Sequence, residues 1–312
     1  MRIAMVGSGS MGSAFGGKLT EAGNEVWLID VWKEHVDKMT RKGLHIEGVG
    51  GDRVVKVKAT TDHSQPGPVE LVIVFTKSAD TKTAALQSLP LKGENTLYLT
   101  IQNGLGNREI IASVVGNNRV LSGVTFDSAN LLETGHVKHT STGRTVIGEI
   151  DGTISQRAEK IAEVFRKAGF DMQVSTNVLN EVWGKLLVNC VTSPIAVLTQ
   201  ETIGGLIDYP SGREWMRLVG EEVASVAQAL SIRLPYDNVM DKLLKNSQAA
   251  GAAKPSMRQD VEKGRWTEID FINGAVVREA KRVGVPTPYN LALTLMIRMI
   301  DARAHREEKT FA

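Results

Sequence analysis

The chain has 312 residues, of which 42% are apolar and 23% are charged, and its formal net charge is +2 at pH 7. This is an ordinary globular composition, ample for a sizeable core, and the length suggests two domains. The near-neutral charge gives no reason to expect a nucleic-acid or membrane partner.

Compartment and membrane signals are sparse. Cys190 is the only cysteine, so no internal disulfide can form, and we expect a reducing, cytoplasmic location. Its apolar neighbours favour a buried structural thiol over a nucleophile. The N-terminal apolar run breaks at Gly7, so we expect no signal peptide. We expect no stretch to approach the roughly 20 apolar residues that are needed to span a bilayer.

The first half of the chain alternates strand-length apolar runs with helical patterns. This alternation predicts a parallel, doubly wound sheet. The expected strands are 2–6, 25–29, 71–75, 97–101 and 120–125, with helices at 11–22, 80–89 and 108–115. Further along, we expect a hairpin insertion around 54–58, antiparallel strands at 136–139 and 144–148, a helix at 155–168 and a last strand at 171–175.

A glycine-rich segment, Gly7-Ser-Gly-Ser-Met-Gly12, joins the first expected strand to the first expected helix. In the G-x-G-x-x-G pattern, the glycines permit a tight turn, close approach of a pyrophosphate and close packing of the helix on the strand. The helix N-terminus then offers N–H groups and a partial positive charge to the phosphates. The pattern also occurs in tight turns that bind nothing.

The second expected strand ends in Asp30, near the spacing of about 20 residues at which a carboxylate can bind the ribose hydroxyls. Together with the glycine segment, Asp30 predicts a Rossmann-type dinucleotide-binding domain.

Beyond about residue 178, strand patterns give way to long amphipathic helices, expected at 179–191, 213–230, 267–283 and 290–302. We therefore predict two domains: a dinucleotide-binding Rossmann domain at 1–176 and a helical substrate and dimerisation domain at 177–312. The fold class is α/β, a Rossmann-type doubly wound sheet followed by an all-α domain. Chemistry is then expected just after the strands and on the first helix of the second domain.

Two polar residues follow strands of the expected sheet. Lys77 comes after the strand 71–75, and Asn103 comes after 97–101 in a Gln-Asn-Gly sequence. Each has an ordinary alternative: a solvated lysine at a strand end, and an asparagine in a turn. Their shared position at the carboxyl edge, beside the glycine segment, favours a role in the site.

Lys185 and Asn189 are spaced i, i+4 on the expected helix 179–191, and Ser193 continues the same face. Their neighbours are mostly apolar, so a lysine here costs desolvation energy unless it is used. Burial would lower its pKa toward the range of a general acid. The alternative is a lysine that extends its ammonium group to solvent.

Two further candidates lie near the expected helix 267–283. Ser256 follows a proline, and Glu268 lies in the sequence Thr267-Glu-Ile-Asp270. Carboxylates in a first helical turn are favoured by the helix dipole, so spacing alone does not separate a capping role from a catalytic one.

At this point the residues resemble the ketopantoate reductase (2-dehydropantoate 2-reductase) family, over nearly the whole chain. The motifs that carry the resemblance are Gly7-Ser-Gly-Ser-Met-Gly12, Thr76-Lys77, Gln102-Asn-Gly-Leu-Gly106, Lys185-Leu-Leu-Val-Asn189, Ser256-Met-Arg-Gln-Asp260 and Thr267-Glu-Ile-Asp-Phe-Ile-Asn-Gly274. The resemblance implies reduction of a 2-keto acid by NADPH or NADH, a homodimer and a place in pantothenate biosynthesis. It implies no metal.

The resemblance also implies roles for individual residues. Lys185 is the general acid, and Glu268 orients it together with the cofactor. Asn189, Ser193 and Ser256 occupy substrate-binding positions. The implied cofactor-binding positions are Gly7, Ser8, Gly9, Ser10, Met11, Gly12, Asp30, Lys77, Asn103, Ala129 and Glu268.

Three positions depart from the family pattern. Ser193 and Ile203 stand where the family often has asparagine, which leaves the identity of the keto acid open. Asp30 stands where NADPH-dependent members usually have a basic residue, and a carboxylate repels a 2′-phosphate, so we expect a preference for NADH. The alternatives are an NADH-dependent D-2-hydroxyacid dehydrogenase for branched 2-keto acids and, more remotely, a non-catalytic dinucleotide sensor.

Overall fold

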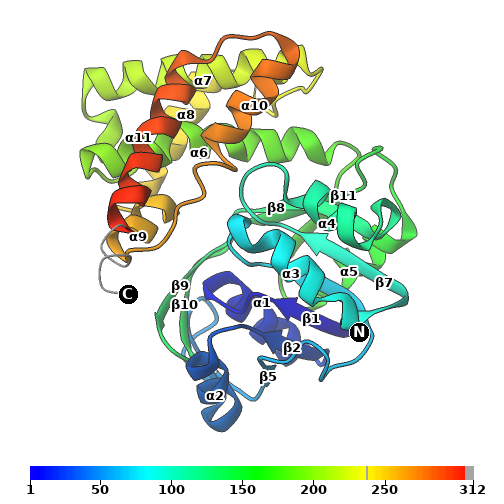
Figure 1. Ribbon diagram of the computed structural model, residues 1–312. Helices are drawn as coiled ribbons and strands as arrows, with labels where there is room; N and C mark the ends of the chain where they lie inside the picture. Colours follow the sequence, from blue (N-terminus) through cyan, green and yellow to red (C-terminus); the bar gives the residue numbers. More distant parts are fainter. Residues whose placement is uncertain (237, 306–312) are drawn as a thin grey trace. The chain divides into compact units, whose positions relative to one another are not determined.

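The computed structural model describes residues 1–236 and 238–305. The chain divides into two compact units (Figure 1). The first comprises Met1–Gln102 and Gly106–Val178, and the second comprises Asn103–Leu105 together with the chain from Leu179 onward.

An eight-stranded sheet forms the centre of the first unit, in the order β12-β11-β8-β7-β6-β1-β2-β5. Neighbouring strands from β5 to β8 are parallel, whereas β11 runs antiparallel to β8. This confirms the predicted doubly wound fold. The strands are β1 (Arg2–Val6), β2 (Glu25–Ile29), β5 (Lys58–Thr60), β6 (Val69–Val74), β7 (Lys92–Thr100), β8 (Val120–Thr125), β11 (Arg144–Gly148) and β12 (Asp171–Val174).

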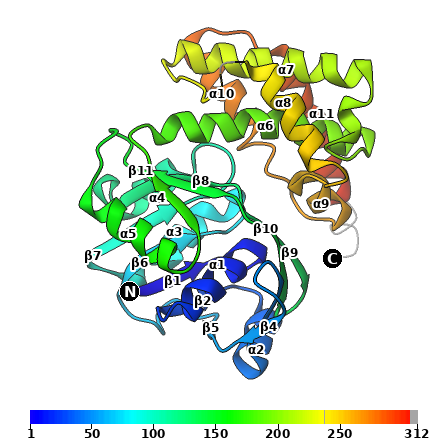
Figure 2. The same cartoon turned by 180° about the vertical axis from the view of Figure 1, so that it is seen from behind.

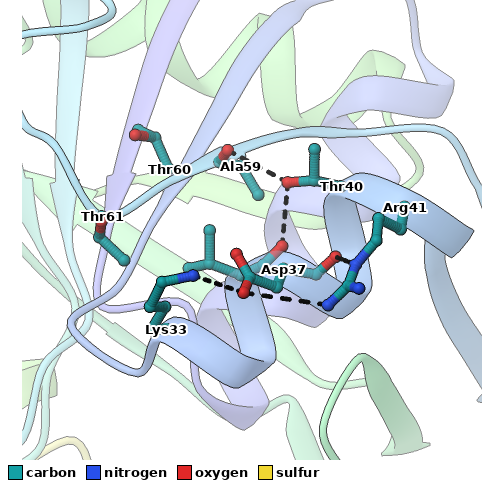
Figure 3. Close-up of a pocket in the computed structure, with 8 residues that line it drawn as sticks. Lys33, Asp37, Thr40, Arg41, Ala59, Thr60 and Thr61 are labelled. Atoms are coloured by element: carbon teal, nitrogen blue, oxygen red, sulfur yellow. Dashed lines mark hydrogen bonds and ion pairs between the residues drawn. The ribbon is translucent and has the colours of Figure 1, made fainter.

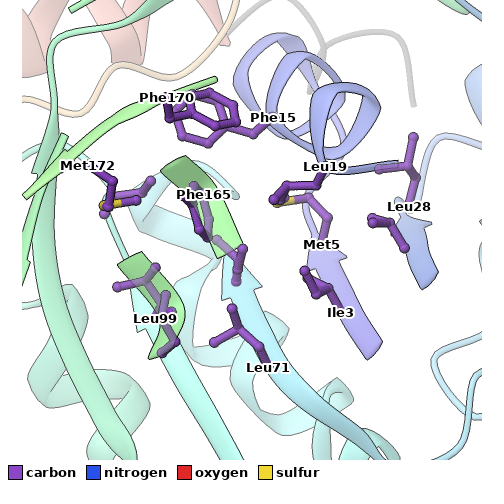
Figure 4. Packing of buried hydrophobic residues seen from close by; sticks show 14 of the residues in the cluster. Ile3, Met5, Phe15, Leu19, Leu28, Leu71, Leu99, Phe165, Phe170 and Met172 are labelled. Carbon is purple, nitrogen blue, oxygen red and sulfur yellow. The ribbon is translucent and has the colours of Figure 1, made fainter. Parts of the chain in front are cut away.

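Successive side chains of a strand point to opposite faces of the sheet. Because the buried strands are apolar at successive positions, both faces of the sheet are apolar, and helices cover both. Along β1, Ile3 and Met5 join the cluster beneath α1 (Ser10–Glu21) and α5 (Gln156–Lys167), which Figure 4 shows and Figure 2 views from that side. Ala4 and Val6 join the opposite cluster, beneath α3 (Thr81–Gln87) and α4 (Asn107–Val115).

A second, four-stranded sheet has the order β4-β3-β10-β9. The expected hairpin insertion is present, as β3 (Leu44–Gly48) paired antiparallel with β4 (Arg53–Val55). The expected strand at 136–139 is β10 (His136–Ser141), which is antiparallel to β9 (Ser128–Glu133) but parallel to β3. The sequence did not predict β9, nor the polar helix α2 (Lys33–Lys42). The small sheet matters for the site because β9 packs against α1.

Among its described residues, the second unit contains helices and no strand. They are α6 (Val178–Thr199), α7 (Pro210–Ala229), α8 (Val239–Ala250), α9 (Ser256–Glu262), α10 (Asn273–Val283) and α11 (Pro288–Ala304).

The predicted helix start at 267–270 is wrong, because α10 begins only at Asn273. Residues 268–272 form turns instead, and the Thr267 hydroxyl donates to Asp301 Oδ2 at 2.7 Å. Glu268 and Asp270 therefore lie before α10 and do not occupy a first helical turn.

A buried polar chain fixes α6 against its neighbours. Pro194 lies inside α6 and has no N–H to offer the carbonyl of Cys190 one turn earlier. Asn273 Nδ2 donates to that carbonyl at 3.1 Å and to Asn290 Oδ1 at 3.0 Å. Asn290 Nδ2 in turn donates to Glu222 Oε2 at 2.7 Å, and the Glu222 carboxylate also caps the start of α11.

The membrane expectation needs one correction. By length and composition, α6 is long and apolar enough to cross a bilayer, contrary to the expectation that no stretch would be. However, 67% of its apolar window is buried inside the protein, where it provides much of the second unit's core. The packing needs of a central core helix are enough to explain its apolar composition.

Candidate active site

Two of the three glycines of the nucleotide loop are required by close contacts with the backbone. Gly7 has φ +91°, and a Cβ there would lie 2.5 Å from the backbone nitrogen of Thr76. At Gly12 a Cβ would lie 2.0 Å from the carbonyl oxygen of Gly7, so the helix could not pack as closely. Neither position can accept a side chain without a backbone shift.

Gly9 differs from both, because a Cβ there would have nothing within 4 Å. A side chain at this position would therefore not clash with the rest of the protein. The open space lies directly before α1, where free N–H groups and the helix dipole favour an anion. The loop therefore fits a pyrophosphate, and the glycine permits its close approach.

Asp30 is held in place at the end of β2 by two backbone donors. Ser8 N–H donates to its Oδ2 at 2.7 Å, and Trp32 N–H donates to its Oδ1 at 3.0 Å. Each carboxylate oxygen retains a further lone pair that could accept a ribose hydroxyl. The carboxylate thus supports the loop and fixes a negative charge beside it.

The remaining loop residues have separate positions. The Ser8 hydroxyl points inward and donates to the carbonyl of Ile29 at 3.2 Å, so this side chain does not face a ligand. Ser10 Oγ accepts from the N–H of Leu131 at 3.0 Å, which ties the loop to β9. Met11 is partly buried against the core. Ala129 lies on the same strand as Leu131, two positions earlier.

Lys77 is partly buried in the turn that follows β6. Gln102, to which the sequence motif assigned no role, holds this turn: its Nε2 donates to the Thr76 carbonyl at 2.8 Å and to Thr81 Oγ1 at 2.9 Å. Behind it, Thr81 donates to the buried Asn107 at 2.8 Å. The ends of β6 and β7 are therefore cross-linked by side chains that only the tertiary structure brings together.

Asn103 groups with the second unit, although it follows a strand of the first. The N–H of Leu105 donates to the carbonyl of Phe271 at 2.8 Å, and a Cβ on Gly104 would lie 2.2 Å from the same oxygen. The segment 103–105 therefore packs on the turn that carries Glu268. Leu105 and Phe271 lie 166 positions apart in the sequence, so local spacing could not predict this contact.

Lys185, Asn189 and Ser193 all lie on α6, as the helical spacing predicts. Lys185 and Asn189 are partly buried and Ser193 is buried, while Leu186, Leu187, Cys190 and Val191 on the same helix belong to the apolar core. The three residues thus lie one helical turn apart, among apolar core residues of the same helix.

Glu268 and Ser256 are also in the second unit. Glu268 is buried in the turn before α10, with 7% of its surface exposed. Ser256 is exposed at the first position of α9. Ile203, one of the positions that depart from the family pattern, is partly buried after α6. Among the described residues, no group of three His, Cys, Asp or Glu side chains is arranged to hold a metal.

Cys190 is fully buried in the core of the second unit. Burial raises the pKa of its thiol well above the ordinary value, because the thiolate would have to form without solvent. The expected burial of Cys190 is confirmed, and the raised pKa argues against a nucleophilic thiolate.

A surface cavity of about 430 Å³ lies between α2 and β5, just beyond Asp30 in the sequence (Figure 3). The two cations that line it are both directed at Asp37: Lys33 Nζ lies 2.6 Å from Asp37 Oδ2, and Arg41 Nη2 lies 3.9 Å from it. Lys33 lowers the pKa of this carboxyl, and Arg41 adds to the effect. Lys33 is thus paired within its own helix.

Two family models match the chain. One is described as "Ketopantoate reductase PanE/ApbA" and matches residues 3–152; the other, its C-terminal counterpart, matches 177–301. With the Rossmann-type sheet and the helical second unit, these matches place the protein among the NAD(P)H-dependent oxidoreductases that act on CH–OH groups. More specifically, the chain belongs to the ketopantoate reductase family, which confirms the resemblance.

Relatives with the same family name match this chain over nearly its full length. A 2-dehydropantoate 2-reductase of Archaeoglobus fulgidus is 31% identical over 96% of this chain and 98% of its own. One from Halobacterium salinarum is also 31% identical, with the same coverage.

Solved structures include two with a TM-score of 0.91. A PanE/ApbA family ketopantoate reductase from Ralstonia eutropha JMP134 is 32% identical, covering 98% of this chain and all of its own. A D-mandelate dehydrogenase, solved with NADH and anilino(oxo)acetate, is 28% identical with the same coverage.

Proposed function

We propose that the protein is a 2-dehydropantoate 2-reductase, which reduces the C2 carbonyl of ketopantoate to the alcohol of pantoate and so serves pantothenate biosynthesis. The observation that carries the proposal is the face of α6 on which Lys185, Asn189 and Ser193 lie one helical turn apart, among apolar core residues. The curated relatives named for this activity support the choice of substrate.

When bound, reduced nicotinamide supplies a hydride to C2 of the keto acid. As the C–H bond forms, the carbonyl π electrons move onto oxygen. In our proposal the Lys185 ammonium group stabilises this developing alkoxide and donates a proton to it. The lysine is left neutral and regains a proton from solvent, so the cycle balances.

The other candidate residues of the second unit would bind the keto acid or orient the reacting groups. We propose that Asn189, Ser193 and Ser256 donate hydrogen bonds to the keto acid, and that the Glu268 carboxylate orients the Lys185 ammonium group and the cofactor. The dinucleotide would be held in the first unit by the backbone of residues 7–12 and by Asp30, Lys77 and Ala129. Asn103, which groups with the second unit, would also contact the cofactor.

A second candidate function is reduction of another 2-keto acid by NADH, as in a D-2-hydroxyacid dehydrogenase. Ser193 and Ile203 favour it, because both stand where family members often place an asparagine. The similarity to a D-mandelate dehydrogenase solved with NADH is compatible with it.

The experiment that tests the function is a comparison of kcat/KM for ketopantoate and 2-ketoisocaproate, each with NADH and with NADPH. Preference for ketopantoate supports the proposal, whereas clear preference for 2-ketoisocaproate favours the second candidate. Tight NADH binding without turnover of either acid would indicate a dinucleotide sensor.

We further propose that NADH is the preferred cofactor. The Asp30 carboxylate is fixed by two N–H groups, so it cannot move away from a 2′-phosphate, while it can accept the free hydroxyls of NADH. The nearby Lys33 is paired with Asp37.

The variant Asp30→Asn is expected to shift the NADH-to-NADPH ratio of kcat/KM toward NADPH by roughly tenfold, about 1.4 kcal/mol. The amide oxygen still accepts one N–H, which helps keep the loop in place. Glu94→Gln, which removes an exposed charge early in β7, is the control and should leave the ratio unchanged. An unchanged ratio in Asp30→Asn would remove this carboxylate from cofactor discrimination.

A further inference from the structure

His35 of α2 is fully buried behind the nucleotide loop, and both of its ring nitrogens are engaged. Nε2 lies 2.8 Å from the carbonyl oxygen of Ser8, and Nδ1 lies 2.9 Å from the backbone nitrogen of Gly135. A backbone N–H can only donate, so Nδ1 must be the acceptor. The ring is therefore neutral, with its proton on Nε2, which donates to Ser8.

The Ser8 carbonyl belongs to the peptide that leads into Gly9, and that peptide is held from several sides. The Ser13 hydroxyl donates to the same carbonyl oxygen, and the N–H of Ser8 donates to Asp30. In a planar trans peptide, the C=O and the following N–H point in opposite directions. With the Ser8 carbonyl directed at His35, the N–H of Gly9 is directed away from α2.

The other half of the histidine contact reaches the small sheet. Gly135 lies in the turn between β9 and β10, so His35 connects this turn to the nucleotide loop. A second connection is the hydrogen bond from the N–H of Leu131 to Ser10 Oγ. A third joins α2 to β9, where Lys38 Nζ lies 2.7 Å from Glu133 Oε1.

We propose that His35 is a positioning residue for the dinucleotide: its neutral imidazole orients the Ser8–Gly9 peptide so that the Gly9 N–H faces the pyrophosphate, and it links that peptide to the β9–β10 turn. The proposal rests on the placement of the cofactor at the glycine loop proposed above. It extends the cofactor site to α2 and the small sheet, neither of which belongs to the G-x-G-x-x-G pattern.

Protonation gives this arrangement a measurable signature. Burial lowers the pKa of His35 below its ordinary value, and Lys38 lowers it further. The hydrogen bond to Ser8 and the nearby Asp30 carboxylate raise this pKa, but by less than burial lowers it. A protonated ring would place an N–H at Nδ1 against the N–H of Gly135. The neutral form that holds the loop is present above the lowered pKa, so NADH binding should weaken as the pH falls through it.

The experiment measures the dissociation constant of NADH by nicotinamide fluorescence, from about pH 8 to about pH 5. For the wild-type protein we expect a constant value near pH 8 and a rise of roughly tenfold at the acidic end. His35→Gln, whose amide N–H can still reach Ser8, should bind within a few-fold of wild type near pH 8 and lose most of the pH dependence. His35→Phe should bind roughly tenfold more weakly at every pH.

Two further measurements separate positioning from a structural role. Tm at each pH identifies loss of folding, and steady-state kinetics should show a raised KM for NADH with kcat little changed. The control is His63→Gln, since burial also lowers the pKa of His63, while the carboxylates of Asp62 and Asp30 oppose that shift. This variant should retain the wild-type pH profile.

A wild-type pH profile in His35→Gln, or unchanged NADH affinity in a folded His35→Phe, would overturn the role of His35. Failure of the wild-type protein to bind NADH at any pH would instead refute the cofactor site on which the proposal rests.

Discussion

Replacing Lys185 by alanine is expected to lower kcat for keto-acid reduction by roughly 10³-fold or more, with little change in NADH affinity. In our proposal the Lys185 ammonium group both protonates the alkoxide and stabilises its negative charge. Each of these contributions raises the rate by about 10²-fold or more. Lys185 is the only lysine on α6, so no neighbouring lysine of that helix can substitute for it.

Single-turnover kinetics with saturating NADH would measure this loss directly. Lys281→Ala on α10 is a suitable control, because it removes an exposed helical lysine from the same unit. Lys185→Arg separates the two roles, since arginine keeps the charge but rarely gives up a proton. If Lys185→Ala retained turnover within a few-fold of wild type, the general acid would have to be sought elsewhere.

Replacing Gly12 by alanine is expected to lower stability, whereas replacing Gly9 by alanine is expected mainly to weaken NADH binding. Gly12→Ala would bring a methyl group against the Gly7 carbonyl, and we expect the free energy of unfolding to fall by roughly 3 kcal/mol or more. Gly9→Ala fills open space, so we expect its free energy of unfolding to fall by much less, about 1 kcal/mol or below. We expect NADH to bind the folded Gly9→Ala protein at least tenfold more weakly.

Urea denaturation and NADH titration on both variants provide the measurement. Each variant is the control for the other, because both add one methyl group to the same loop. Normal NADH affinity in Gly9→Ala would mean that no pyrophosphate approaches this backbone, and the predicted cofactor position would be wrong.

The main sheet was predictable because its strands are short apolar runs with clear ends. The expected ranges 2–6, 25–29 and 120–125 coincide with β1, β2 and β8. The helix α2 was missed because it is strongly charged and buries only His35, Val36 and Met39. The strand β9 was missed because none of its residues is fully buried, so apolar alternation is weak there.

The candidate site was predictable where function depends on local pattern. The glycine loop and the i, i+4 pair on α6 depend on neighbouring residues, so spacing was enough to place them. The contacts of His35, Gln102 and Asn273 join segments far apart in sequence, and no local pattern specifies them. The homodimer, the cytoplasmic location and the domain boundary at residue 176 stay predictions.

The proline in α6 makes two distant positions dependent on each other. Pro194 frees the Cys190 carbonyl, and Asn273 occupies it. A residue with an N–H at 194 would compete for that carbonyl, whereas an apolar residue at 273 would leave it buried and unpaired. We therefore expect that, within this family, a substitution at position 194 is tolerated only with a compatible residue at position 273, and the reverse. The hydrogen bond that couples them joins Cys190 to Asn273, which lie 83 positions apart.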